Sequence, residues 1–226
     1  MGASELPKPY DALGQVNLMD GLLSEKPNRY RLLVVDTFEN LRPYRPRAAS
    51  TDLSDVRYIF KTPDERAFQI ERELVEGWSD LKPAFERSLM VYTSFSVPGR
   101  QSYWLRPAEP VFVRGQLFRG SIWVHSNTYR HSLTLLFENA DGREIRVPLA
   151  NLHWDGWRRL SFSLPAELYR RGRRADNRYD HKFTGFLITS HPLGKAGPVA
   201  IMLDNFLIIS DYKEFQYPGF EYLDRF

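Results

Sequence analysis

The chain lacks several features, and each absence narrows the class of protein. Its 226 residues include no cysteine, which excludes disulfide bonds and thiolate metal sites. No apolar run of about 18 residues occurs, so we expect no membrane insertion. The net charge of +3 is too small to indicate a nucleic-acid partner. The start of the chain has no apolar core of an export signal, so we expect that this chain carries no signal peptide.

Motifs of the common enzyme classes are also missing. The sequence has no HExxH, GxSxG, P-loop or GxGxxG pattern, and its five histidines form no pair at metal-ligand spacing. We therefore expect a protein that is not an enzyme and has no catalytic residues. A sandwich-fold hydrolase is the remaining enzymatic alternative, and it needs two carboxylates facing each other in a cleft.

Four segments in the middle of the chain alternate apolar and polar residues, as half-buried strands do. They are residues 121–125, 132–138, 144–149 and 159–164. Asp141-Gly142 favours a tight hairpin turn between the second and third segments. We expect these four strands to form an antiparallel meander that buries one face against a second sheet. This arrangement predicts a mainly β fold, a jelly-roll β-sandwich.

Further elements are expected on both sides of this region. Strands are predicted at residues 31–38, 56–60, 88–95, 101–105, 186–190 and 199–209, and the last is apolar enough to lie centrally in a sheet. Pro43 and Pro46 break the strand pattern, and one or two short helices are expected, one of them ending at Gly77. We divide the chain into an N-terminal arm (1–30), extended apart from one turn of helix, a β-sandwich domain (31–211) and an aromatic C-terminal tail (212–226).

Three carboxylates are candidates for one metal site. Asp36 and Glu39 follow the first strand, and Asp204 interrupts the last one. The first and last strands of a sandwich often lie side by side, so the three side chains could hold a structural Ca²⁺ through oxygen ligands. The alternative is that Asp204 accepts hydrogen bonds from backbone donors or pairs with an arginine, as a half-buried carboxylate requires. No other cofactor is expected.

Aromatic and basic residues are candidates for partner binding. Trp104 and Trp123 could stack on sugar rings, although a tryptophan in a sandwich is more often a core anchor. The arginine cluster, which we define as Arg170, Arg171, Arg173 and Arg174, is the densest positive charge and could dock on an acidic partner. A solvated loop is its alternative role. In the tail, Tyr217, Phe220 and Tyr222 are further candidates for contacts with a partner protein.

An ordered set of segments along residues 89–211 resembles a known family. These segments are SFSVPGRQSYWLRP, GQLFRGSIWVHSNTYRHSLTLLFENADGREIRVPL, HWDGWRRLSFSLP, FTGFLITS and GPVAIMLDNFLIISD. Together they look like the spirochaete periplasmic flagellar filament outer layer (sheath) protein family, FlaA. The DGW corner is shared with carbohydrate-binding jelly rolls.

The resemblance implies a jelly roll akin to galactose-binding domains and carbohydrate-binding modules. It also implies export to the periplasm, where the protein would pack on a flagellin core beside other sheath proteins and contribute to filament shape and motility. A carbohydrate-binding module is the alternative function on the same fold. The two functions could meet if the protein recognised a glycan attached to flagellin.

Overall fold

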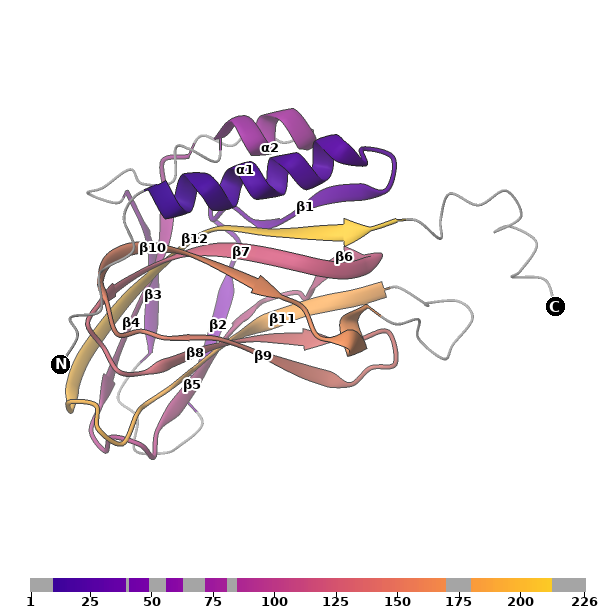
Figure 1. Cartoon of the computed structure of the whole chain (residues 1–226). Helices are drawn as coiled ribbons and strands as arrows, with labels where there is room; N and C mark the ends of the chain where they lie inside the picture. Colours follow the sequence, from indigo (N-terminus) through magenta and orange to yellow (C-terminus); the bar gives the residue numbers. More distant parts are fainter. Residues whose placement is uncertain are drawn as a thin grey trace.

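The computed structural model describes residues 10–39, 41–48, 56–62, 72–80, 85–169 and 180–212. Within these residues, two six-stranded antiparallel sheets pack face to face, and two helices lie over one of them (Figure 1). The mainly β, jelly-roll sandwich expected from the sequence is confirmed.

Sheet A has the strand order β10-β7-β12-β4-β3, and β1 pairs with the second half of β12. Sheet B has the order β2-β5-β11-β8-β9, and β6 pairs with β11. The strands of sheet A are β1 (Tyr30–Asp36), β3 (Arg57–Lys61), β4 (Ser88–Phe95), β7 (Gln116–Asn127), β10 (Asp155–Ser163) and β12 (Gly197–Asp211). Those of sheet B are β2 (Tyr44–Ala48), β5 (Ser102–Pro107), β6 (Val111–Arg114), β8 (Ser132–Glu138), β9 (Glu144–Asn151) and β11 (Asp180–Thr189). The helices are α1 (Tyr10–Glu25), α2 (Arg72–Trp78) and the 3₁₀ turn η2 (Ala166–Leu168).

The four central strands do not form the expected meander. The β8–β9 hairpin belongs to sheet B, whereas β7 and β10, which flank it in the sequence, pair with each other in sheet A. The chain therefore crosses between sheets before and after the hairpin. An alternating pattern specifies which face of a strand is buried but not which strand lies beside it, so sequence neighbours were wrongly taken as sheet neighbours.

Local sequence explains two features of sheet B, the β8–β9 turn and a proline within β2. The β8–β9 hairpin turns at Gly142, whose φ is 80°, and the Asn139 side chain accepts hydrogen bonds from the Asp141 and Arg143 amides at 3.1 and 2.9 Å. Pro46 lies inside β2, where a break was expected. The strand tolerates it because β2 is at the edge of sheet B, where a missing N–H disrupts fewer ladder bonds.

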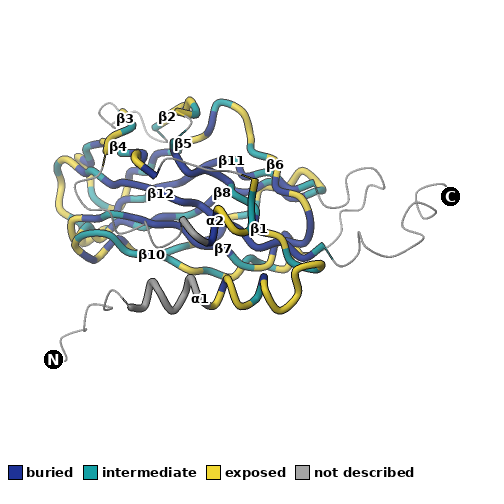
Figure 2. Tube along the Cα trace, turned by 90° about the horizontal axis from the view of Figure 1, so that it is seen from above, coloured by how far each residue is buried: buried dark blue, intermediate teal, exposed yellow. Residues whose placement is uncertain are grey.

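The core lies between the sheets and is richest along β12, which is central in sheet A as predicted. Figure 2 shows that buried residues concentrate in the inner strands, while the described residues 18–25 of α1 are mostly exposed. The predicted inward faces are confirmed on β7, where Ile122 and Val124 are fully buried, and on β8, where Leu133, Leu135 and Phe137 are.

A second apolar cluster lies on the other face of sheet A, beneath the helices. Met19 and Leu23 of α1 pack there with Trp123 of β7 and with Leu207 and Ile209 of β12. A turn of helix was expected only around Leu18–Leu23, so the extended arm is wrong for the rest of Tyr10–Glu25, which form one helix. Its two glycines weaken the local helical signal, and packing on the sheet compensates for them. No helix among the described residues is long and apolar enough to cross a membrane.

Candidate functional site

The first candidate site is at the end of β1, where Asp36 is buried. Its Oδ1 accepts a hydrogen bond from the Phe38 amide at 2.7 Å, and its Oδ2 accepts one from the Tyr44 hydroxyl at 2.8 Å. Arg42 Nε lies 3.6 Å from Oδ2. Burial raises the pKa of Asp36, and the charge of Arg42 and the two hydrogen bonds oppose that rise. These contacts already use both carboxylate oxygens.

The other two carboxylates also bind protein donors. Asp204 is buried at a bulge of β12, where its Oδ2 accepts from the Ser88 hydroxyl at 2.6 Å and its Oδ1 from the Asn205 amide at 2.7 Å. Glu39 Oε1 accepts from the amides of Glu86 and Arg87 at 2.6 and 2.8 Å. Asp36 therefore links the end of β1 to the start of β2, Glu39 links the segment after β1 to the residues before β4, and Asp204 links the middle of β12 to the first residue of β4.

These contacts bear on the proposed calcium site. Within the described part of the chain, no three His, Cys, Asp or Glu side chains lie together so that they could hold a metal ion. The backbone and hydroxyl partners match the alternative role given for Asp204. Calcium binding stays a prediction, and it is contradicted if the melting temperature is unchanged both in EDTA and in excess calcium.

The two candidate tryptophans have different environments. Trp123 is 4% exposed and lies under α1 in the second apolar cluster, so its ring has no open face for a sugar and that prediction is wrong. The residues opposite Ile122 and Val124 on β7 are covered because the helices form a third layer. Trp104 lies on the outer face of sheet B, half-exposed, with Arg106 Cζ 6.0 Å from its ring centre. Sugar stacking at Trp104 stays a prediction.

The arginine cluster and the tail candidates lie outside the described residues. This applies to Arg170, Arg171, Arg173, Arg174, Tyr217, Phe220 and Tyr222. Their proposed roles rest on the sequence alone and stay predictions.

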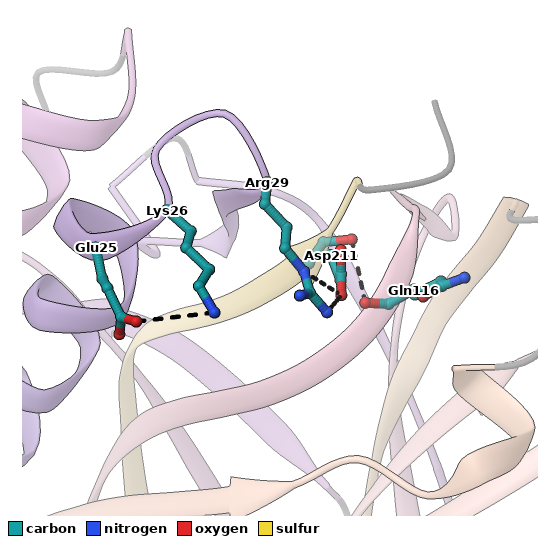
Figure 3. A network of polar contacts seen from close by, with 6 residues as sticks. Glu25, Lys26, Arg29, Gln116 and Asp211 are labelled. Atoms are coloured by element: carbon teal, nitrogen blue, oxygen red, sulfur yellow. Dashed lines mark hydrogen bonds and ion pairs between the residues drawn. The ribbon is translucent and has the colours of Figure 1, made fainter. Parts of the chain in front are cut away.

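The point from which the tail leaves the sandwich is well defined. Asp211, the last residue of β12, is 2% exposed, and its Oδ2 accepts hydrogen bonds from Arg29 Nε at 2.9 Å and Nη2 at 2.6 Å (Figure 3). This contact raises the pKa of Arg29. The Tyr212 amide donates to the Arg29 carbonyl at 2.7 Å, and Gln116 of β7 lies beside Asp211 in Figure 3. The tail therefore starts from a fixed position next to β1.

A groove that the sequence did not predict adjoins this position. It has a volume of about 610 Å³, and residues 30–34 of β1 form its floor. Trp78 at the end of α2 lines one side, Phe112 of β6 lines the other, and Tyr212 also contributes. Phe112 is 61% exposed, which is high for a large apolar residue. The only sequence signal was this apolar residue in a short strand, because the groove depends on how the two sheets meet.

Comparison with solved structures finds several carbohydrate-binding modules. A family 11 carbohydrate-binding module from Clostridium thermocellum, in complex with a β-1,3-1,4-mixed-linked tetrasaccharide, is 9% identical, with coverage of 80% of this chain and 96% of that one and a TM-score of 0.43. The solution structure of CtCBM11 is 8% identical, with coverage of 80% and 95% and a TM-score of 0.46. TmCBM61, in complex with β-1,4-galactotriose, is 11% identical, with coverage of 79% and 99% and a TM-score of 0.40. A search of curated proteins finds no match to this sequence.

A family model gives the more specific result. The model described as flagellar filament outer layer protein FlaA matches residues 114–217, a stretch that includes β7 to β12 and so contributes to both sheets. The resemblance to the FlaA family, drawn from the order of motifs in the sequence, is thereby confirmed over these residues.

Proposed function

We propose that the protein is a non-enzymatic outer layer (sheath) subunit of a periplasmic flagellar filament, located in the periplasm. In this role it packs on the flagellin core beside other sheath proteins and contributes to filament shape and motility. The match of residues 114–217 to the FlaA model is the observation that carries the proposal.

The architecture supports a coating role. Two sheets with a continuous core and a helical layer make a rigid body, which suits a subunit that is repeated along a filament. Many weak lateral contacts between such subunits add through effective concentration. The N-terminal arm, the arginine cluster and the aromatic tail are the proposed contact surfaces.

Co-sedimentation with isolated periplasmic flagellar filaments tests this function, with soluble glycans as competitors. We expect the protein to pellet with filaments and to remain bound when glycans are added. Failure to pellet with filaments from any source that carries a FlaA-type sheath would overturn the proposal.

Carbohydrate binding is the second candidate, and Trp104 is the specific observation that favours it. Its half-exposed ring on sheet B lies among cationic side chains, including Arg47 directly across the strand pair and Arg106 above the ring. Aromatic rings flanked by polar groups bind sugars, and a glycan on flagellin would be a natural ligand.

Paired substitutions distinguish the two functions. If a glycan releases the protein from filaments, Trp104→Ala should abolish that binding, whereas Tyr92→Ala, an exposed aromatic residue on sheet A, should not. If the protein binds filaments normally but binds no glycan on a glycan array, the carbohydrate function is ruled out.

A further inference from the structure

The strand β1 has one unpaired edge among the described residues. It pairs with β12 along residues 30–36, and no other described strand continues the sheet beyond it. An open edge exposes backbone donors and acceptors and is a template for another strand, so proteins normally cover or disrupt it.

The backbone groups that face this edge follow from the register. The Tyr212 amide donates to the Arg29 carbonyl, which makes Arg29–Tyr212 a hydrogen-bonded pair. Pairs alternate in an antiparallel ladder, so the N–H and C=O groups of Leu32 and Val34 point away from β12 toward the groove. The Tyr30 amide, which also points this way, already donates to the Lys26 carbonyl at 3.0 Å. The backbone N–H and C=O groups of Leu32 and Val34 are thus the ones available to pair with an added strand.

The two walls of the groove are apolar and lie on opposite faces of the sheet. Trp78, at the end of α2 above β1, lines the outer side (Figure 1). Phe112 and Val113 of β6 line the inner side, where sheet B begins. A strand added to β1 would therefore place alternate side chains against the tryptophan and the phenylalanine. Backbone bonds to an edge combined with pockets for alternate side chains are the requirements for β-strand addition.

The tail of this protein has the matching sequence. Residues 213–226 contain Phe215 and Tyr217 two positions apart, and Phe220 and Tyr222 two positions apart. Residues two apart lie on one face of a strand, so each pair would meet the same wall. Fully extended, these residues reach about 45 Å, while the five-residue edge of β1 is about 17 Å long. The tail is long enough to reach a neighbouring molecule and still cover the edge.

Chain topology favours a tail from a second molecule. The tail leaves β12 at Tyr212, at the same end of the sheet where residues 26–29 enter β1, so within one molecule it would have to pass this connection to reach the open edge. Connections rarely cross in this way at the same end of a sheet.

We infer that the groove along β1, with Trp78 and Phe112 as its walls, binds the aromatic tail of a second copy of this chain as an added strand. The contact joins two different surfaces, so it is heterologous, and repeated from copy to copy it forms an open chain of subunits unless the rotation between copies closes it into a ring. The inference goes beyond the proposed function and does not rest on it, because it concerns self-association of the pure protein.

Site-directed cross-linking tests the contact, and because the chain has no native cysteine, only the introduced cysteines react. A ¹⁵N-labelled chain carrying Asp80→Cys, at the groove, is mixed with an unlabelled chain carrying Glu221→Cys, in the tail, and both are joined with a short bismaleimide. Lys195→Cys replaces Asp80→Cys as the control, since it lies in the turn at the far end of β12. We expect mixed-isotope dimers at Asp80 to exceed those at Lys195 by about tenfold, because binding raises the effective concentration of the tail.

A second pair of variants tests the groove wall. Phe112→Glu should lower the mixed-dimer yield about tenfold, since a few buried aromatic anchors carry most of the binding energy of an interface. Leu193→Glu, at a residue that is 69% exposed and remote from the groove, should leave the yield unchanged. Both positions are exposed, so both variants should fold normally.

Two outcomes overturn the inference. One is an equal yield at Asp80 and Lys195. The other appears in a single chain with Asp80→Cys and Glu221→Cys, if only intrachain links form, because the tail then occupies its own groove. Neither outcome affects co-sedimentation with filaments, so failure of this contact is distinguishable from failure of the proposed function.

Discussion

His181 is a polar side chain buried without hydrogen-bond partners. Its ring has no exposed surface, and neither Nδ1 nor Nε2 has a partner in the described structure. Burial lowers its pKa from 6.5 to about 4, although the charges of Asp180 and Asp141 oppose the shift. The folded protein therefore keeps this ring neutral where the unfolded chain would protonate it.

This difference predicts a loss of stability in acid. Between pH 6.5 and about pH 4 the unfolded chain binds a proton at His181 that the folded chain does not, so the free energy of unfolding falls as the pH falls. The cost approaches about 3 kcal/mol once the pH is below the folded-state pKa. His181→Leu should remove this cost. Measured by urea unfolding, the free energy of unfolding of the variant should therefore exceed that of wild type by more near pH 4.5 than at pH 7.

His153 provides the control for this prediction, since it is exposed. His153→Leu should leave the pH dependence of stability as in wild type. If His181→Leu loses stability between pH 7 and 4.5 as steeply as wild type, the acid sensitivity has another source.

Individual residues also show what the sequence could and could not reveal. Alternation on β7 correctly placed Ile122 and Val124 in the core, because a period of two follows from strand geometry alone. The same pattern left open whether Trp123 faces solvent. Its burial depends on α1, a distant segment whose helical signal is weak, and no local pattern around Trp123 contains that information.

At the scale of single elements, α1 should be held to sheet A mainly by its buried apolar residues. Leu23 is fully buried against the sheet, while Leu18 on the same helix is 51% exposed. Leu23→Ala should lower the free energy of unfolding by about 2–4 kcal/mol through lost burial and a residual cavity. Leu18→Ala should change it by less than about 0.5 kcal/mol. Equal effects in chemical denaturation would show that α1 does not dock as described.

Two glycines should respond to alanine with opposite signs. Gly142 turns the β8–β9 hairpin with φ at 80°, a conformation that costs an L-residue about 1 kcal/mol, so Gly142→Ala should destabilise by roughly that amount. Gly21 lies inside α1, and the space into which an added Cβ would project is open, so Gly21→Ala should stabilise by about 0.5–1 kcal/mol. Melting temperatures that shift in the same direction for both variants would contradict this account.

Strand positions were predictable where a strand carries its own alternating pattern, as β4 and β8 do, whereas the short strands β2 and β6 were not predicted. Pairing was predictable only where a local turn specified it, as Asp141-Gly142 does for β8 and β9. The pairing of β7 with β10 spans the whole hairpin between them and depends on core packing, which leaves no short-range signal. The groove beside β1 was missed for the same reason, since α2, β6 and β1 meet there from distant parts of the chain.

For the whole molecule, charge distribution offers a test of how the protein meets a filament. The net charge is small, so nonspecific attraction is weak, but the arginine cluster concentrates four positive charges within five residues of sequence. Guanidinium groups pair with carboxylates, and such contacts weaken as salt screens them. If the cluster docks on an acidic filament surface, binding should fall with ionic strength.

Neutralising the cluster should therefore weaken filament binding and flatten its dependence on salt. In a variant with Arg170, Arg171, Arg173 and Arg174 all changed to Gln, we expect affinity about tenfold lower at low salt, and nearly equal to wild type at high salt, because electrostatic complementarity acts mainly when unscreened. The control is Arg100→Gln with Arg130→Gln, two exposed arginines outside every proposed binding surface, which should leave binding unchanged. Co-sedimentation across a salt series measures both. A flat salt dependence in the wild-type protein would mean that filament contact is made by apolar surfaces, and attention would move to the aromatic tail.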